Sequence, residues 1–235
     1  MPRAEGADIA IIDRLAGLIR RPWLQTALVL AILLGIFGQI ADEVIEGDTL
    51  GFDHAVTMML RDNGDIRDPI GPPWLEEAGR DLTGLGSFAV LSLVVAVVAG
   101  FLLLVRQYRA ALFVTLAVIS GTILSTASKA VFDRPRPPDA VLRVFTSSFP
   151  SGHATVSAVT YLTLGALLAY LSQDRRQGAF CLGVAIFITF IVGLSRIYLG
   201  VHYPTDVLAG WSLGAAWALL CWVVASLVGL QAHPK

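Results

Sequence analysis

Six long stretches of the chain carry no charged residue. They are 19 to 26 residues long, and the spans that they predict lie at about 22–41, 84–105, 110–128, 154–173, 177–195 and 207–230. Because a helix rises about 1.5 Å per residue, roughly 20 residues cross a hydrocarbon core of about 30 Å. Lipid offers unpaired backbone groups no hydrogen-bond partner, so helices are the expected form. The pattern predicts an all-α fold, a bundle of six transmembrane helices.

The first uncharged stretch, 22–41, is not expected to be a cleaved signal peptide. A segment of 21 residues precedes it, and it is longer than the 7–15 apolar residues of a signal-peptide core. No convincing small-x-small cleavage site follows it. Since no strong internal repeat is present either, we expect a single membrane-embedded domain over residues 1–235.

The loop between the first two stretches is acidic. Residues 42–81 contain eleven acids against three arginines. Within this loop Phe52, Val56, Met59 and Leu60 recur at helical spacing, which predicts a short amphipathic helix on the membrane surface. We expect the loop to be a packing lid without a catalytic residue.

Composition supports a membrane protein and excludes several other classes. Hydrophobic residues make up 55% and charged residues 15% of the chain, whereas a soluble domain carries about 25% charged residues. Disorder is excluded by the high hydrophobicity. A net charge of −1 leaves no basic excess for binding nucleic acid. Cys181 and Cys221 both fall in apolar stretches, so no disulfide framework is implied.

The distribution of basic residues predicts the orientation. Arginines gather before the first stretch and in the turns after the second and fourth, namely Arg3, Arg14, Arg20, Arg21, Arg106, Arg109, Arg175 and Arg176. The positive-inside rule then places both termini in the cytoplasm and the acidic loop outside. The outer loop with Lys129, Arg134, Arg136 and Arg143 breaks this rule. Either the topology is misassigned, or these cations serve chemistry.

Ionisable residues also gather at the ends of the predicted spans. The loops after the third and fifth spans open on the same membrane face, because two crossings separate them. The residues that can meet there are Lys129, Arg136, His153, Arg196, His202 and Asp206. Ionisable groups at the depth of the lipid headgroups are costly and usually functional.

These residue types suit the transfer of a phosphoryl group. Lys129, Arg136 and Arg196 can surround its equatorial oxygens, where negative charge accumulates. His202 and Asp206 are four residues apart, so on a helix the carboxylate can fix the imidazole tautomer and leave the other nitrogen free to attack. His153 can then protonate the departing oxygen.

Each feature has a simpler explanation when it is taken alone. Lys129 and Arg196 could anchor the ends of spans by snorkelling, and a His-x3-Asp pair could be a structural hydrogen bond. A Ser-Gly-His triplet occurs by chance, and a basic loop is usually a solvated face. We favour a site, because these explanations would all have to hold at once, on one face and at these spacings.

The motifs resemble those of the type 2 phosphatidic acid phosphatase superfamily of integral-membrane lipid phosphatases. Its signature has three parts, and no position departs from it. Lys-x6-Arg-Pro is met by Lys129 with Arg136-Pro137, Pro-Ser-Gly-His by residues 150–153, and Ser-Arg-x5-His-x3-Asp by residues 195–206. The second pair, Arg134-Pro135, is off register, so Arg134 is not expected to be a phosphate ligand.

The resemblance implies a role for each matched residue. His202 would be the nucleophile that forms a phosphohistidine, Asp206 would orient it, and His153 would be the general acid, with water attacking in the second step. The implied phosphate ligands are Lys129, Arg136, Ser151, Gly152 and Arg196. The family is usually metal-independent, so no metal and no cofactor are expected. The acids near the motifs are too few for a two-metal cluster, being only Asp133, Asp139 and Asp206.

The expected function is that of a lipid phosphatase at the outer face of a bacterial cytoplasmic membrane. Its partners would be membrane lipids and a lipid phosphate or diphosphate, with undecaprenyl diphosphate, phosphatidylglycerol phosphate and phosphatidic acid as candidates. A phosphotransferase using the same phosphohistidine stays open, and so does a non-enzymatic transporter or lipid-binding scaffold. Vanadium haloperoxidases share the signature but are soluble. The oligomeric state is left open.

Two smaller predictions concern residues outside the signature. Arg143, Tyr198 and Tyr203 flank it and are candidates for contact with a headgroup or diphosphate. Gly210 and Gly214 form a small-x3-small pair in the last span, which predicts a close contact with another helix.

Overall fold

The computed structural model describes residues 21–62, 65, 67–137 and 146–229, and the elements within these ranges are α-helices joined by turns and loops. These helices are α2 (Pro22–Glu46), α3 (Leu50–Met59), α4 (Pro73–Gly84), α5 (Phe88–Leu104), α6 (Tyr108–Phe132), α7 (Gly152–Leu171), α8 (Arg175–Tyr198) and α9 (Pro204–Leu227). The all-α prediction is confirmed. Some residues used in the predictions lie outside the described ranges, namely Arg3, Arg14, Arg20, Asp139, Arg143 and residue 230.

Five helices are long and apolar enough to cross a membrane: α2, α6, α7, α8 and α9. The remaining predicted span, 84–105, corresponds to α5, which has only 17 residues. It begins at Phe88, because the Ser87 side chain accepts a hydrogen bond from the Val90 amide and caps the helix. Helices α4 and α5 together make a sixth candidate span, bent by 47° at the break between them. The predicted membrane bundle is therefore confirmed, with a bent pair in place of one straight span.

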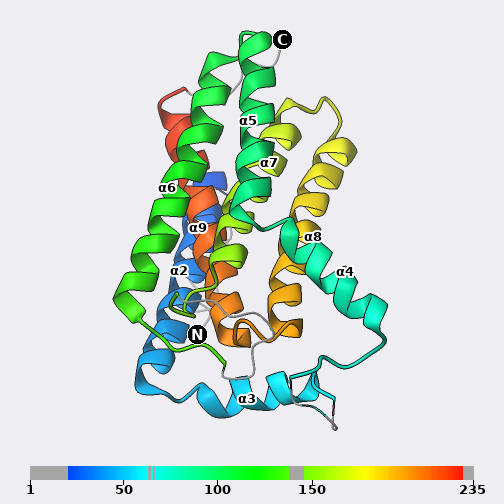
Figure 1. Cartoon of the computed structure of the whole chain (residues 1–235). Coiled ribbons are helices and arrows are strands. Elements are labelled where there is room, and N and C mark those ends of the chain that lie inside the picture. The colour runs from blue at the N-terminus through cyan, green and yellow to red at the C-terminus, as the bar shows by residue number, and fades with distance from the viewer. Residues whose placement is uncertain (1–20, 63–64, 66, 138–145, 230–235) are drawn as a thin grey trace, which may run out of the picture.

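The four helices that carry the motifs run antiparallel in chain order. Figure 1 shows that α6 and α8 end, and α7 and α9 begin, at the end of the bundle across which α3 lies. The predicted convergence of the loops after the third and fifth spans is thus observed. This end of the bundle is called the α3 end below.

Small residues let α7 and α9 approach closely. A Cβ atom at Gly214 would lie 2.5 Å from the Thr155 carbonyl oxygen, and one at Gly210 would lie 2.8 Å from the Ser151 carbonyl oxygen. Neither position leaves room for a side chain, so the predicted small-x3-small contact is confirmed. The contact at Gly210 places the start of α7 directly against the first turns of α9.

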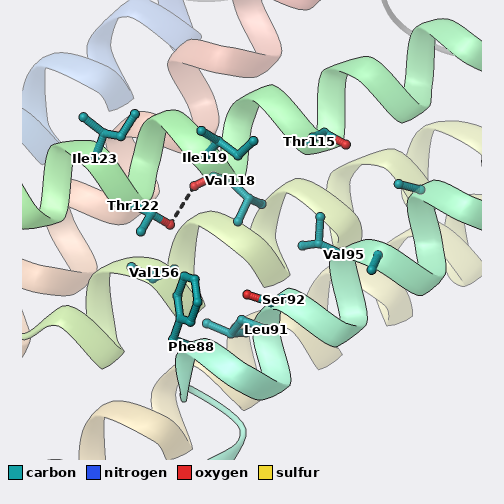
Figure 2. A pocket seen from close by; sticks show the side chains of 12 residues that line it. Phe88, Leu91, Ser92, Val95, Thr115, Val118, Ile119, Thr122, Ile123 and Val156 are labelled. Atoms are coloured by element: carbon teal, nitrogen blue, oxygen red, sulfur yellow. Dashed lines mark hydrogen bonds between the residues drawn. The ribbon is translucent and has the colours of Figure 1, made fainter.

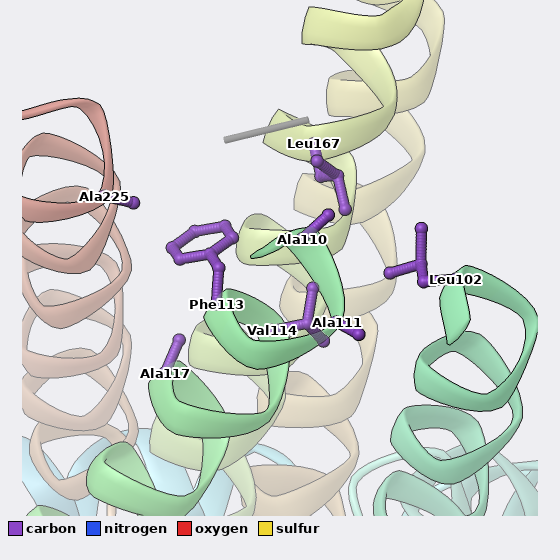
Figure 3. Close-up of a cluster of buried hydrophobic side chains, with 8 residues drawn as sticks. All are labelled: Leu102, Ala110, Ala111, Phe113, Val114, Ala117, Leu167 and Ala225. Atoms are coloured by element: carbon purple, nitrogen blue, oxygen red, sulfur yellow. The ribbon is translucent and has the colours of Figure 1, made fainter. Parts of the chain in front are cut away.

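A cluster of buried apolar side chains holds the opposite end of the bundle together. Figure 3 shows its members projecting from α5, α6, α7 and α9 toward one another. They are Leu102, Ala110, Ala111, Phe113, Val114, Ala117, Leu167 and Ala225. Because lipid tails are as apolar as these side chains, the cluster stabilises the bundle through van der Waals packing. Packing at this end can therefore hold the helices in register while polar residues fill the α3 end.

The predicted amphipathic helix is present as α3, but its polar side faces the protein. Asp53 and Thr57 are buried, whereas the side chains of Phe52 and Met59 are 55% and 74% exposed. The apolar side is thus turned outward, as a helix on a membrane surface requires. The inward polar side brings a carboxylate of the acidic loop into the interior of the α3 end.

Candidate active site

All three predicted motifs meet at the α3 end of the bundle. Lys129 lies in the last turn of α6 and Arg196 in the last turn of α8. Asp206 lies in the first turn of α9, which begins at Pro204. His202 lies in the turn between α8 and α9, and it is 1% exposed.

Asp206 orients the imidazole of His202. Its Oδ2 atom lies 3.4 Å from His202 Nδ1, and it accepts a hydrogen bond from the Tyr203 amide at 2.9 Å. The Ser148 hydroxyl donates a short hydrogen bond to the same oxygen. These contacts hold the carboxylate against one edge of the ring, although His202 lies in the turn before α9 and not on a helix as the spacing argument assumed.

The other ring nitrogen of His202 faces Arg136. A guanidinium nitrogen of Arg136 lies 3.1 Å from His202 Nε2 and also donates to the Val201 carbonyl at 2.7 Å. Because a guanidinium can only donate hydrogen bonds, Nε2 must accept, and the ring proton then belongs on Nδ1, facing Asp206. This assigned tautomer leaves the lone pair on the nitrogen that faces the cations.

Burial keeps the His202 ring neutral. Loss of hydration lowers the pKa of His202 to about 3, against the opposing effect of Asp206, and Arg136 and Arg196 lower it further. A neutral imidazole retains the lone pair that a nucleophile needs. The site therefore holds His202 in a reactive form at neutral pH.

Three neighbouring cations lie at this site: Arg136 contacts the ring, Arg196 interacts with it electrostatically, and Lys129 interacts electrostatically with both arginines. Across the described ranges, no ion pair joins Lys129, Arg136 or Arg196 to a carboxylate. Asp206 influences Lys129 and Arg136 electrostatically, but its carboxylate is paired with Arg134. Neighbouring like charges that are partly removed from water require a compensating anion. The cluster is thus suited to a group with several negative charges.

Arg196 is the most deeply buried of these cations. One guanidinium nitrogen donates to the Thr83 hydroxyl at 2.9 Å, and the side chain is only 5% exposed. Its Nε atom is buried and has no hydrogen-bond partner among the described residues. A buried donor of this kind is costly unless something binds it, and a phosphate oxygen is a suitable acceptor.

Lys129 and His153 share a small cavity of about 170 Å³ with Gly152. Lys129 Nζ donates to the Ser147 carbonyl at 2.7 Å, and a Cβ atom at position 152 would lie 3.3 Å from Lys129 Cε. Glycine at this position leaves room for the lysine beside the start of α7. His153 is close enough to Lys129, Arg196 and His202 to interact with each of them electrostatically.

Ser151 serves as the N-cap of α7. Its hydroxyl accepts a 3.5 Å hydrogen bond from the Ala154 amide, and its own amide donates to the Asp206 carbonyl at 2.9 Å. The side chain is completely buried. Ser151 thus connects the first turns of α7 and α9, in addition to any contact with phosphate.

The structure also contains polar residues that the motifs did not identify. Arg134 is buried and forms ion pairs with Asp206 at 2.6 Å and with Asp53 of α3 at 2.7 Å. That the acidic loop carries no catalytic residue stays a prediction, but the loop does bring Asp53 into contact with the ion-pair partner of Asp206. One signal was available, because Asp53 is the only charged residue in Leu50–Met59.

The two flanking tyrosines have protein contacts. The Tyr198 hydroxyl donates to the Ile70 carbonyl at 2.9 Å, which ties α8 to the segment before α4. The ring of Tyr203 lies 4.4 Å from the Arg134 guanidinium carbon, in a cation–π contact. Arg143, the third flanking residue, lies outside the described residues. As for metals, no group of three His, Cys, Asp or Glu side chains suited to an ion occurs within the described part of the chain.

Comparison with known proteins identifies the family. The PAP2 superfamily pattern matches residues 110–228. Phosphatidylglycerophosphatase B of Bacillus subtilis is 34% identical over 62% of this chain and 72% of that protein. Lipid A 1-phosphatase of Rhizobium etli is 32% identical over 75% of this chain and 82% of its own length.

A solved structure shows the same fold. The crystal structure of a transmembrane PAP2-type phosphatidylglycerolphosphate phosphatase from Bacillus subtilis matches with a TM-score of 0.75 and 26% identity. The match covers 85% of this chain and 96% of that one. Fold, family pattern and relatives agree, and the chain belongs to the PAP2 superfamily as a membrane phosphatase that hydrolyses phosphoric esters.

Proposed function

We propose that the chain removes a phosphate group from a membrane lipid through a phosphohistidine at His202. The observation that carries this proposal is the cluster of Lys129, Arg136 and Arg196 around a neutral, oriented imidazole. The cations lack carboxylate partners within the described residues, so a phosphate would supply the missing charge. A bound phosphoryl group would then lie beside the lone pair of Nε2.

The first chemical step would transfer the phosphoryl group to the enzyme. Arg136 transfers its hydrogen bond from Nε2 to a phosphate oxygen, and the freed Nε2 lone pair forms a bond to phosphorus. The bond from phosphorus to the leaving oxygen breaks. His153, which would take up a proton when the phosphate anion binds beside it, donates that proton to the leaving oxygen. Asp206 accepts a hydrogen bond from Nδ1 and stabilises the positive charge that develops on the ring.

The second step would return the enzyme to its starting state. His153, now neutral, accepts a proton from water as the water oxygen attacks phosphorus. The bond from phosphorus to Nε2 breaks, and inorganic phosphate is released. Throughout both steps the phosphate oxygens would accept hydrogen bonds from Lys129, Arg136 and Arg196. Ser151 and Gly152 complete the proposed set at the start of α7, where helix amides and the helix dipole favour an anion.

An apolar cavity beside the site supports a lipid as substrate. A cavity of about 550 Å³ lies among α5, α6 and α7, as Figure 2 shows. It shares Phe88, Leu91, Thr122 and Val156 with the smaller cavity that contains Lys129 and His153. A lipid could place its phosphate near His153 while an apolar chain follows this cavity toward the surrounding membrane.

The candidate substrates are undecaprenyl diphosphate, phosphatidylglycerol phosphate and phosphatidic acid. Relatives named phosphatidylglycerophosphatase B and lipid A 1-phosphatase support a phosphate on a lipid as the common chemistry. We place the site at the extracytoplasmic face of a bacterial cytoplasmic membrane. The acidic loop lies at the α3 end, and the cationic turns at Arg106 and Arg175 lie at the other.

The decisive test compares His202→Ala with the wild-type protein in detergent. Phosphate release is measured from each of the three candidate lipids, together with the amount of lipid consumed. We expect the variant to lose at least about a thousandfold in kcat, because no other group can take the phosphoryl group. His54→Ala is the matched control, since His54 is an exposed histidine of α3.

Two results would contradict the proposal. Wild-type turnover in the His202→Ala variant would exclude this residue as the nucleophile. Lipid consumption without an equal release of free phosphate would indicate transfer to an acceptor other than water. If the wild-type protein acts on only one of the three lipids, that result identifies the substrate among them.

A further inference from the structure

The interior of the α3 end contains a chain of charged groups that starts on α3. Asp53 is fully buried. Its Oδ1 atom accepts a hydrogen bond from the Thr205 amide at 3.0 Å, and its Oδ2 atom accepts from the Thr205 hydroxyl at 2.6 Å. Oδ2 also receives a guanidinium N–H of Arg134 at 2.7 Å. Both carboxylate oxygens of Asp53 therefore accept hydrogen bonds from Thr205 at the start of α9, and Oδ2 accepts a further one from Arg134.

Arg134 joins this carboxylate to the one beside His202. One terminal nitrogen donates to Asp53 and to the Thr49 hydroxyl at 3.0 Å. The other donates to Asp206 Oδ1 at 2.6 Å and to the Thr205 hydroxyl at 2.9 Å. With these acceptors and 7% exposure, Arg134 is committed to the protein and is not available to a phosphate. Its task differs from that of Arg136, two residues later.

We propose that Asp53 and Arg134 are positioning residues that fix the Asp206 carboxylate against His202. This proposal rests on the proposed roles of His202 and Asp206 and adds the residues that hold them. Neither Asp53 nor Arg134 touches the reacting atoms: Asp53 holds Arg134, and Arg134 holds Asp206. Helix α3 thereby acts on the reaction through a contact behind the nucleophile.

The geometry explains why both residues are needed. Arg134 binds Oδ1 of Asp206, so the carboxylate keeps its other oxygen, Oδ2, turned toward His202 Nδ1. Asp53 accepts from the Thr205 amide, a free amide at the start of α9, and so stabilises the turn from which Asp206 projects. Loss of either residue would leave Oδ1 of Asp206 without Arg134, so that only Ser148 and the Tyr203 amide hold the carboxylate, both through Oδ2. The imidazole would then be oriented less precisely.

A buried Arg134 between two carboxylates also satisfies the charge of Asp206. Removing one partner of a buried ion pair leaves an uncompensated charge, which is strongly unfavourable. An asparagine at position 53 would keep the shape of the side chain. It would, however, present an amide N–H₂ or a weaker acceptor to the donors that now meet Oδ2. Asp53→Asn is therefore a mild change that weakens the contact between position 53 and Arg134 without removing Arg134.

The test is the Asp53→Asn variant, assayed with a lipid on which the wild-type protein is active. We expect kcat to fall about 10- to 100-fold, with KM and the inhibition constant of inorganic phosphate unchanged within about twofold. The phosphate-binding cations are untouched, so binding should persist while the attack is misaligned. Asp48→Asn is the matched control, because Asp48 is an exposed acid just before α3, and we expect its kinetics to equal those of the wild type.

A second pair of measurements guards against a general loss of structure. kcat is expressed per folded protein, measured by size-exclusion chromatography and thermal unfolding. Arg134→Lys retains the charge, but a single ammonium group cannot reach Asp53 and Asp206 as the two terminal nitrogens of the guanidinium do. The variant should therefore lower kcat at least as much as Asp53→Asn. If either variant fails to fold, the Thr49→Val variant is used as the test of the proposal instead. It removes only one acceptor of Arg134, and we expect it to lower kcat about 3- to 10-fold at constant KM.

The outcomes separate this proposal from the proposed function. An active wild-type protein together with full kcat in Asp53→Asn would overturn the positioning role of Asp53 and Arg134. The proposed phosphatase function would still stand. The same follows if Thr49→Val, used in its place, has full kcat. Equal weakening of kcat and of phosphate binding would also overturn it, since this would indicate a general structural role. A wild-type protein that releases no phosphate from any lipid would instead overturn the function.

Discussion

A histidine that acts as a nucleophile, as proposed for His202, must stay unprotonated and still be oriented. In this protein both requirements are met by burial of His202, by the hydrogen bond from Arg136 to Nε2, and by Asp206 on the other side of the ring. The cations that discourage protonation of the ring are the groups expected to bind the phosphate. In the proposed mechanism the same side chains would therefore keep His202 unprotonated and bind the phosphate.

The lowered pKa of His202 predicts a loss of stability on acidification. In the unfolded chain histidine has a pKa of about 6.5, whereas in the folded protein that of His202 is about 3. Between these two pKa values His202 binds a proton in the unfolded state but not in the folded state. The free energy of unfolding should therefore fall as the pH is lowered from 6.5 toward 3. The loss should be absent above about pH 7.5.

The measurement compares the wild-type protein with His202→Asn in the same detergent. Denaturation midpoints are recorded from pH 8 to 5 by circular dichroism. The difference in stability between the two proteins should change with pH below 6.5 in the direction that disfavours the wild type. A constant difference across this range would show that His202 titrates normally.

The residues of the site were predictable to different degrees. Lys129, Arg136, His153, Arg196, His202 and Asp206 could be placed together, because charge is rare in this chain and the spans fix which loops share a face. Asp53 and Arg134 could not be paired from the sequence. They are separated by 81 positions, and their contact depends on how α3 docks on α9. Hydrophobic periodicity carries no information on such docking.

At the scale of helices, the site depends on how closely α7 and α9 pack. Gly210 and Gly214 bring the backbone of α9 against that of α7, and Ser151 donates from its amide to the Asp206 carbonyl. His153, the proposed general acid, lies in the first turn of α7, and Asp206 lies in the first turn of α9. Their separation is therefore set by a contact between two backbones.

Widening this helix contact should destabilise the protein. In Gly214→Ala the new methyl group would meet the Thr155 carbonyl oxygen and Ala158, and such overpacking typically costs about 1–3 kcal/mol. Gly183→Ala is the matched control, because the space around Gly183 is open. At such a site the substitution stabilises a helix by about 0.4–1 kcal/mol. Equilibrium unfolding in mixed micelles measures both, and a stable Gly214→Ala variant would contradict the packing described.

Helix prediction from the sequence succeeded for the spans whose position is determined by an uncharged, apolar stretch alone. Uncharged stretches located α2, α6, α7, α8 and α9 to within a few residues. The bend between α4 and α5 was missed, because the charge pattern marks where an apolar stretch ends and not the direction of the chain. Helix α3 was predicted from its apolar side, while the polar side facing the protein stayed unrecognised.

On the scale of the whole molecule, the two ends of the bundle differ in kind. One end is held by apolar side chains around Phe113, and the other encloses the charged groups of the site (Figures 1 and 3). The cationic turns at Arg106 and Arg175 lie with the apolar end. This separation lets the protein support a cluster of buried charges at one end without weakening the packing at the other.

The proposed orientation predicts which end is reached from outside the cell. Single cysteines at Asp48, before α3, and at Gln173, after α7, are introduced after Cys181 and Cys221 have been replaced by serine. Both positions are exposed. A membrane-impermeant maleimide should label Asp48→Cys but not Gln173→Cys in intact protoplasts, and both after permeabilisation. The reverse pattern would place the site in the cytoplasm.

The apolar cavity of Figure 2 has a consequence for how such an enzyme meets its substrate. Phe88, Ile119 and Ile123 on its rim are all more than half exposed, so it opens sideways from the bundle. A ligand arriving by this route diffuses in two dimensions and never leaves the bilayer. The rate of the reaction then depends on the mole fraction of the substrate among the membrane lipids. Dilution with inert lipid would slow the reaction, while dilution with buffer would not.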